Sequence, residues 1–181
     1  KEEVMGDSLI TIIAIILAAV LMFVFPLMAM SDRTDDVTQL AVKTATTDFV
    51  DTVRTTGKLT SDNYSKFVEN INSTGNTYDV EMEVKVLDEN PGKKTAQTAT
   101  EKIGENVYYS MYTSQILEAL GKNNNNAVLA LKEGDYFIVS VKNTNTTLSQ
   151  QLKNFFYTVT GNDTYTIAAS HGGIVSTNGV K

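Results

Sequence analysis

The chain has 181 residues, a formal net charge of −6, a pI near 4.8 and no cysteine. Without cysteine it can form neither a disulfide framework nor a thiolate metal site, so a folded part must depend on its hydrophobic core. The acidic balance argues against nucleic acid or an anionic membrane face as the partner of that folded part.

The first predicted element is an uncharged apolar run, Leu9–Met30, in which Thr11 is the only hydroxyl residue and Pro26 the only helix breaker. A helix rises about 1.5 Å per residue, so 22 residues suffice to cross a hydrocarbon core of about 30 Å. A cleavable secretory signal is one alternative, but the run is longer than a signal core and follows Lys1-Glu2-Glu3. A helix buried in a globular domain would have to be covered on every side. We therefore predict a helix that lies, at least at one stage, in lipid or in an environment that excludes water equally well.

The same helix is expected to continue through Ser31–Thr56, which contains neither glycine nor proline, and to end at Gly57. Apolar residues recur there at three- and four-residue steps, at Val37, Leu40, Ala41, Ala45, Phe49, Val50 and Val53. Charges occupy the other side, at Asp32, Arg33, Asp35, Asp36, Lys43, Asp48, Asp51 and Arg54. Since Pro26 cannot donate to the carbonyl four residues earlier, we expect a bend or a locally melted turn near Phe23–Pro26.

Residues 1–30 and 31–57 are thus the two halves of one helix, and residues 58–181 are predicted to form a globular head. A helix capped by Ser61 and closed by Gly75 carries an apolar stripe of Tyr64, Phe67, Val68 and Ile71. An antiparallel strand follows, with its inner side at Tyr78, Val80, Met82, Val84 and Val86. A turn is expected at 88–92, a surface loop at 93–106 and a second helix over Tyr108–Leu120.

The last third of the chain alternates strands with one helix. We expect a strand over Ala127–Leu131, a turn with Gly134 at positive φ, and a strand with Phe137, Val139 and Val141 inside. Thr147 and Gln150 form a capping box before an amphipathic helix that carries Leu148, Leu152, Phe155 and Phe156. The closing strand, Tyr165–Val175, is expected to bulge or bend at Gly172-Gly173. The predicted fold class is α+β, with three or four antiparallel strands packed on the long helix and on short ones.

No pattern in the chain favours an enzyme, a cofactor or a metal. His171 is the only histidine, and without cysteine or a nearby nucleophile we interpret it as structural or incidental. Gly134 and Gly172-Gly173 lack the sequence context of a phosphate-binding loop. The acids Asp32, Asp35 and Asp36 lack the spacing of a calcium loop, so we interpret them as a solvated collar.

An apolar half followed by an amphipathic half in one N-terminal helix resembles the type IV pilins and their relatives. Ordinary type IV pilins carry a glutamate inside the apolar run, whereas Glu2, Glu3 and Asp7 precede it here. The chain more closely resembles the tight-adherence, TadE-like pilins and pseudopilins of Gram-positive bacteria. The segments that resemble them are Phe25-Pro26, Phe49-Val50-Asp51 with Thr56-Gly57, Gly134-Asp135-Tyr136-Phe137, Thr147-Leu148 with Phe155-Phe156-Tyr157, and Ser170-His171-Gly172-Gly173.

The resemblance implies a structural subunit of an extracellular, Tad-like pilus. Its helix would wait in the cytoplasmic membrane and then form the dry centre of a filament of identical subunits on the cell surface. A prepilin peptidase and the pilus assembly machinery would be further partners. Gly6 is a candidate cleavage glycine that would leave Asp7 as the new end, although processing, if any, is expected to fall before Lys1.

A filament of this kind needs cohesion and register. We expect the assembly core to include Leu9, Ile13, Ile16, Leu17, Ala18, Leu21, Phe25 and Pro26. Register between neighbours is assigned to Asp32, Arg33, Asp35, Asp36 and Lys43. An exposed ion pair contributes only about 0 to 1 kcal/mol, so burial of the apolar run must supply the cohesion.

Two further features leave alternatives open. Asn63, Asn72, Asn145 and Asn162 each begin an Asn-x-Ser/Thr triplet and are candidate glycan acceptors. In a sequence rich in Asn and Thr such triplets also arise by chance, and a neutral, well-hydrated exterior is the plainer interpretation. As a whole, the chain could instead be a single-pass membrane-anchored extracytoplasmic binding domain, or a minor pseudopilin of a secretion apparatus.

Overall fold

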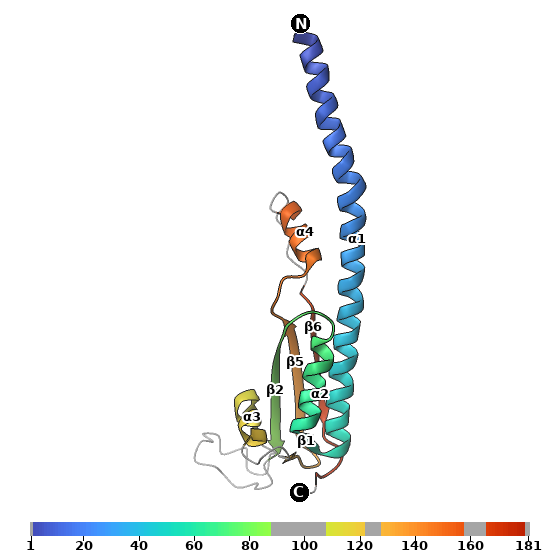
Figure 1. Cartoon of the computed structure of the whole chain (residues 1–181). Helices are drawn as coiled ribbons and strands as arrows, with labels where there is room; N and C mark the ends of the chain where they lie inside the picture. The colour runs from blue at the N-terminus through green and yellow to red at the C-terminus, as the bar shows by residue number, and fades with distance from the viewer. Residues whose placement is uncertain (1, 88–107, 122–127, 158–165, 180–181) are drawn as a thin grey trace, which may run out of the picture. The chain divides into compact units, whose positions relative to one another are not determined.

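The computed structural model describes residues 2–87, 108–121, 128–157 and 166–179 (Figure 1). Its elements are α1 (Glu2–Thr56), β1 (Lys58–Thr60), α2 (Ser61–Asn72), β2 (Tyr78–Leu87), β3 (Tyr108–Tyr112), α3 (Thr113–Gly121), β4 (Val128–Ala130), β5 (Tyr136–Asn143), α4 (Leu148–Tyr157) and β6 (Ala168–Ile174). The predicted α+β class with a long N-terminal helix is confirmed. The turn and loop predicted over residues 88–106 lie outside the described residues.

The chain divides into two compact units. The first unit comprises Lys1–Thr38 and Thr146–Tyr165, and the second comprises Gln39–Asn145 and Thr166–Lys181. This division differs from the boundary predicted after residue 57. The difference arises because the last part of α1 contributes Val42, Phe49 and Val50 to the core of the second unit.

A four-stranded antiparallel sheet, in the order β3-β2-β5-β6, organises the second unit. The inner face of β2 buries Met82 and Val84, as the alternation predicted, and β5 buries Phe137, Val139 and Val141. These residues form one cluster with side chains of α1 and α2, and Figure 1 shows both helices running beside the sheet. In that cluster the Phe49 ring stacks on Phe67, with centroids 4.4 Å apart.

The residues of α1 that are buried differ in part from the predicted apolar stripe. Ala45, Phe49, Val50 and Val53 are buried as expected, but Val37 and Leu40 are 64% and 65% exposed. Ala41 is also exposed, whereas Val42 and Thr46 are fully buried. Thr46 donates its hydroxyl to the carbonyl of Val42 at 2.7 Å, so this polar side chain can lie in the core without an unsatisfied donor. The predicted stripe therefore missed two residues of the packed face, the apolar Val42 and the polar Thr46.

Several boundaries depend on contacts that are distant in sequence. The helix predicted over Tyr108–Leu120 is a strand up to Tyr112, where β3 pairs with Glu83–Leu87 of β2. The short strand β1 was not predicted, and it pairs with β4. The N-cap of α2 is Thr60 rather than Ser61, since its hydroxyl accepts the amide of Asn63 at 3.1 Å.

Gly172 and Gly173 do not form the predicted bulge. The register between β5 and β6 is uninterrupted, with Ile138 opposite Gly172 and Phe137 opposite Gly173. The glycines make room instead, because a Cβ on Gly173 would lie 2.5 Å from the guanidinium carbon of Arg54. Gly173 thus leaves room for the Arg54 side chain of α1, and Gly172 leaves room for Ile138 of β5.

Side chains of α1 also cap the outer edge of β6. Gln39 accepts the amide of Ala168 at 3.0 Å and donates to its carbonyl, while Arg54 Nε donates to the carbonyl of Ile174 at 2.9 Å. His171 Nε2 lies 3.4 Å from Asp51 Oδ1, and Arg54 pairs with the same carboxylate oxygen at 2.8 Å. Side chains of α1 thus cover the β6 edge of the sheet, so this edge is not open to another strand.

Two glycines with positive φ provide a matched test of this packing. Gly57 ends α1 at φ +66°, and an added Cβ would overlap the backbone of Thr177 and Gly179. Gly75 has φ +86° but nothing within 4 Å of an added Cβ. We expect Gly75→Ala to cost about 1 to 2 kcal/mol, the backbone penalty alone, and Gly57→Ala to cost clearly more. Denaturant unfolding of the full chain in detergent micelles, followed by tyrosine fluorescence, measures both, and equal losses would contradict this account.

Candidate assembly surface

The apolar run predicted as the assembly core is helical, and none of its most apolar window is buried by the residues that the structure describes. Its exposed large side chains range from Leu27 at 46% exposed to Met22 at 72%, and Val20, Val24 and Met28 are partly buried. Ala18 and Pro26 are exposed as well. The most apolar window of the helix has a mean hydropathy of 3.0, and none of it is buried. The predicted core residues therefore share one exposed, uncharged helix surface: Leu9, Ile13, Ile16, Leu17, Ala18, Leu21, Phe25 and Pro26.

The polar groups of this surface are satisfied within the helix. Thr11 donates its hydroxyl to the carbonyl of Asp7 at 2.7 Å, which leaves no free donor on its side chain. The helix continues without interruption through Pro26, so the predicted melted turn is wrong. Only the carbonyl of Met22 loses its usual partner there, because proline has no N–H. Such a helix needs no water and is long enough to cross a membrane.

Just beyond the run, α1 meets the start of α4 in the first unit. The predicted capping box is confirmed: Thr147 N donates to Gln150 Oε1 at 3.0 Å, and Gln150 N donates to Thr147 Oγ1 at 3.2 Å. The same Thr147 hydroxyl donates to Asp35 Oδ2 at 2.7 Å. One side chain therefore caps α4 and fixes it to α1.

Asp32 makes the second contact with α4. Its carboxylate accepts the Ser149 hydroxyl and pairs with Lys153 Nζ at 2.6 Å. Burial acts to raise the pKa of Asp32, but the hydrogen bonds from Lys153 and Ser149 and the charge of Lys153 outweigh it and lower the pKa below its ordinary value of 3.8. The ionised form of Asp32 is thus the one that holds α4.

These contacts correct the predicted solvated collar. Asp35 is only 7% exposed and Asp32 is partly buried, since both serve α4 within the same chain. Arg33, Asp36 and Lys43 are exposed, so the structure leaves these three available for the predicted register role. Among the residues that the structure describes, no three Asp, Glu or His side chains gather as metal ligands. Pairing of Asp35 with Thr147 could not be found from local pattern, because the two residues lie 112 positions apart.

Acidification should loosen this contact. Because the pKa of Asp32 is lowered in the folded chain, its contribution is present above the ordinary value of 3.8 and is lost as the pH falls through the folded value. We expect amide hydrogen exchange in α4 to accelerate below that point, relative to the sheet of the second unit. In Asp32→Asn this step should disappear, and an unchanged step in that variant would contradict the assignment.

The glycan candidates differ in their surroundings. Asn72 is exposed at the end of α2 and Asn63 is partly buried. The amide of Asn145 is engaged, since Oδ1 accepts from Thr77 N at 2.9 Å and Nδ2 donates to Asn76 Oδ1 at 2.8 Å. Asn162 lies outside the described residues. Asn72 is therefore the most accessible acceptor of the three described asparagines.

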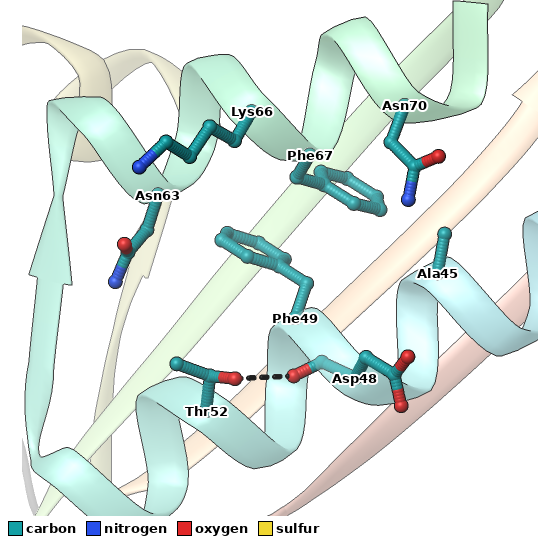
Figure 2. A pocket seen from close by; sticks show the side chains of 8 residues that line it. All are labelled: Ala45, Asp48, Phe49, Thr52, Asn63, Lys66, Phe67 and Asn70. Carbon is teal, nitrogen blue, oxygen red and sulfur yellow. Dashed lines mark hydrogen bonds between the residues drawn. The ribbon is translucent and has the colours of Figure 1, made fainter. Parts of the chain in front are cut away.

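A small groove of about 180 Å³ lies between α1 and α2 (Figure 2). Its base is the stacked pair Phe49 and Phe67, which are 6% and 4% exposed. Polar residues surround this base in Figure 2, namely Asp48, Thr52, Asn63, Lys66 and Asn70. Lys66 pairs with Asp62 along its own helix at 2.7 Å, so its charge does not point to a ligand. The groove is best described as a seam between two packed helices.

The surface that distinguishes this chain is thus an exposed apolar helix next to a polar α1–α4 contact. Comparison with known proteins found no matching family model, no matching curated protein and no matching solved structure.

Proposed function

We propose that this protein is the structural subunit of an extracellular, Tad-like pilus that assembles through Leu9–Met30. The observation that carries the proposal is an uncharged helical run of 22 residues, no part of whose most apolar window is buried by the described residues. An all-round apolar helix is stable in lipid or within a bundle of similar helices. The proposed role is structural and assigns no reaction.

The two environments explain how a subunit could pass from membrane to filament. Both exclude water, so transfer between them keeps the hydrophobic stabilisation of the run, which amounts to about 1.5 to 3 kcal/mol for each large side chain removed from water. Small residues on the same surface, Ala14, Ala18 and Ala19, would allow neighbouring helices to approach closely. The cytoplasmic membrane is thus the proposed store and the cell surface the proposed destination.

The charged residues would then determine register rather than strength. Arg33, Asp36 and Lys43 are exposed, and oppositely charged neighbours could pair between subunits. Each exposed pair is expected to contribute no more than about 1 kcal/mol. Prepilin peptidase and assembly machinery are the further partners that this proposal requires.

Electron microscopy of sheared surface appendages, with mass spectrometry of their subunit and its N-terminus, tests the proposal. We expect thin filaments in which this chain is the main protein. Recovery of the chain only from the membrane fraction, as a monodisperse species in detergent, would instead indicate a membrane-anchored binding domain and overturn the proposal. A filament that needs the chain but does not contain it in quantity would indicate a minor pseudopilin.

A further inference from the structure

Among the residues that the structure describes, no strand pairs with the start of β2 on the β3 side of the four-stranded sheet. Strand β3 pairs with β2 only from Glu83 to Leu87, so the segment Tyr78–Met82 extends beyond its end. Thr113, where α3 begins, occupies the next position: its hydroxyl accepts the Met82 amide at 2.7 Å and donates to the Met82 carbonyl at 3.2 Å. In Figure 1, α3 lies beside β2. On the β3 side of β2, Met82 is thus the residue nearest the start of the strand whose backbone N–H and C=O are both hydrogen-bonded.

The direction of the backbone groups follows from these bonds. The N–H and C=O of Met82 both point to the β3 side, so by strand alternation those of Val80 and Tyr78 do too. The intervening residues Asp79 and Glu81 face Lys142 and Ser140 of β5 in the register. Within the described part of the chain, no backbone hydrogen bond is made by Val80 on its free side. This segment is an open template for another strand.

A groove follows the same segment. It has a volume of about 500 Å³ and is lined by Asp79–Glu83 together with Tyr112, Thr113, Ser114, Ile138 and Ser140. On the inner face, Tyr78 and Val80 are only partly buried against the core, as are Tyr64 and Val68 of α2. An added strand would therefore find apolar contacts on one side. Its opposite side would meet the carboxylates of Asp79 and Glu81, which are both exposed.

The charges on this edge favour a basic segment over a second copy of the chain as the added strand. If a second copy paired by the same edge, antiparallel around Val80, Asp79 would lie opposite Glu81 in both directions, and like charges directly opposite are destabilising. A basic residue opposite Glu81 would be attractive, because such a pair is not hydrogen-bonded through the backbone and its Cα atoms approach to about 4.5 Å. Lys142 lies opposite Asp79 on β5, whereas Glu81 lies opposite the uncharged Ser140. Glu81 is thus the main specificity group of the edge.

We propose that the Tyr78–Met82 edge of β2 binds an extended peptide segment of another protein, with Lys or Arg at every second position and apolar residues between. The basic side chains lie over Asp79 and Glu81, and the apolar ones cover Val80 and Tyr78. Thr113 stops the added strand at Met82 and so fixes its register. This site is independent of the apolar helix surface and of filament formation.

Binding of a capped peptide of alternating valine and lysine to the full chain in detergent micelles tests the proposal, with valine–glutamate as the matched control peptide. We expect the lysine peptide to bind and the glutamate peptide to bind at least fivefold more weakly. The Glu81→Lys variant should lower affinity for the lysine peptide by about fivefold or more and should improve affinity for the glutamate peptide.

Val80→Pro provides the backbone test, since it removes an N–H that the described fold does not use. We expect it to abolish binding of the lysine peptide while tyrosine fluorescence and the unfolding midpoint remain close to the parent values. If Val80→Pro unfolds the chain, an N-methylated lysine peptide replaces it in the test, because N-methylation removes the peptide N–H groups that would donate to the carbonyls of Tyr78 and Val80.

Three results would overturn the proposal. The first is an absence of binding by the lysine peptide, and the second is binding that Glu81→Lys and the backbone change leave untouched. The third is self-association of the solubilised chain that Val80→Pro removes, since the occupant would then be a second copy.

Discussion

Leu17→Asp is expected to abolish filament formation while the second unit stays folded. Leu17 is 56% exposed at the middle of the apolar run, so the substitution empties no buried site within the single chain. A carboxylate at the centre of a membrane helix costs about 2.5 to 3.5 kcal/mol on insertion scales, and a filament core repeats this cost in every subunit. The measurement is the amount of subunit in the sheared appendage fraction, which should fall to background.

A matched substitution outside the run provides the control. Leu117 on α3 is an apolar residue that is 37% exposed, and Leu117→Asp introduces the same charge away from the predicted core. We expect Leu117→Asp subunits to assemble normally. Ala18→Phe, which adds bulk without charge, should fail like Leu17→Asp because close helix approach needs a small residue there. Filaments built from Leu17→Asp subunits would show that the run is not the assembly core.

Phe137→Ala is expected to destabilise the second unit by about 3 to 5 kcal/mol, the usual cost of emptying a phenylalanine site in a core. The Phe137 side chain is fully buried, and its ring meets Phe49 edge-on with centroids 5.9 Å apart. Phe49 in turn stacks on Phe67, so the cavity would open where α1, α2 and the sheet meet. Denaturant unfolding of the full chain in micelles measures the loss.

Ile138→Ala is the control for this core prediction. Ile138 is the next residue of β5, points to the other face of the sheet and is only partly buried. We expect it to cost about 1 kcal/mol or less, since little apolar area is lost. A similar loss for both variants would mean that the core is not where the structure has it.

Long periodic segments were predictable from the sequence, because their pattern repeats over many residues. The apolar run, the alternation of Tyr78–Val86 and the capping box of Thr147 and Gln150 needed no distant partner to be recognised. Gly134 was predicted at positive φ and has φ +94°. In each case the local backbone preference and the final fold agree.

Several of the predictions that failed depend on partners elsewhere in the chain. Strand β1 has three residues, too few to show alternation, and exists because β4 pairs with it. Tyr108–Tyr112 becomes a strand because β2 offers an edge, which decides between helix and strand in an ambiguous segment. Asp35 looked like a solvated acid until Thr147, from a distant helix, supplied its hydroxyl.

The glycine pair in β6 is another case in which a distant partner could not be identified from the sequence. Two adjacent glycines suggested a bulge, but the register is unbroken, and Gly173 leaves room for Arg54 while Gly172 leaves room for Ile138. A sequence pattern can report that a side chain must be absent at a position. It does not report which neighbour needs the space.

In the proposed filament, Leu9–Met30 lies in a dry core made by copies of itself, and the absence of cysteine from the chain allows a direct test. Single variants Leu17→Cys and Leu117→Cys, assembled into filaments and sheared from the cells, are treated with a water-soluble maleimide. We predict that Leu117→Cys is labelled at once and that Leu17→Cys is labelled only after the filaments are dissociated. Equal labelling of both cysteines in intact, membrane-free filaments would contradict the account.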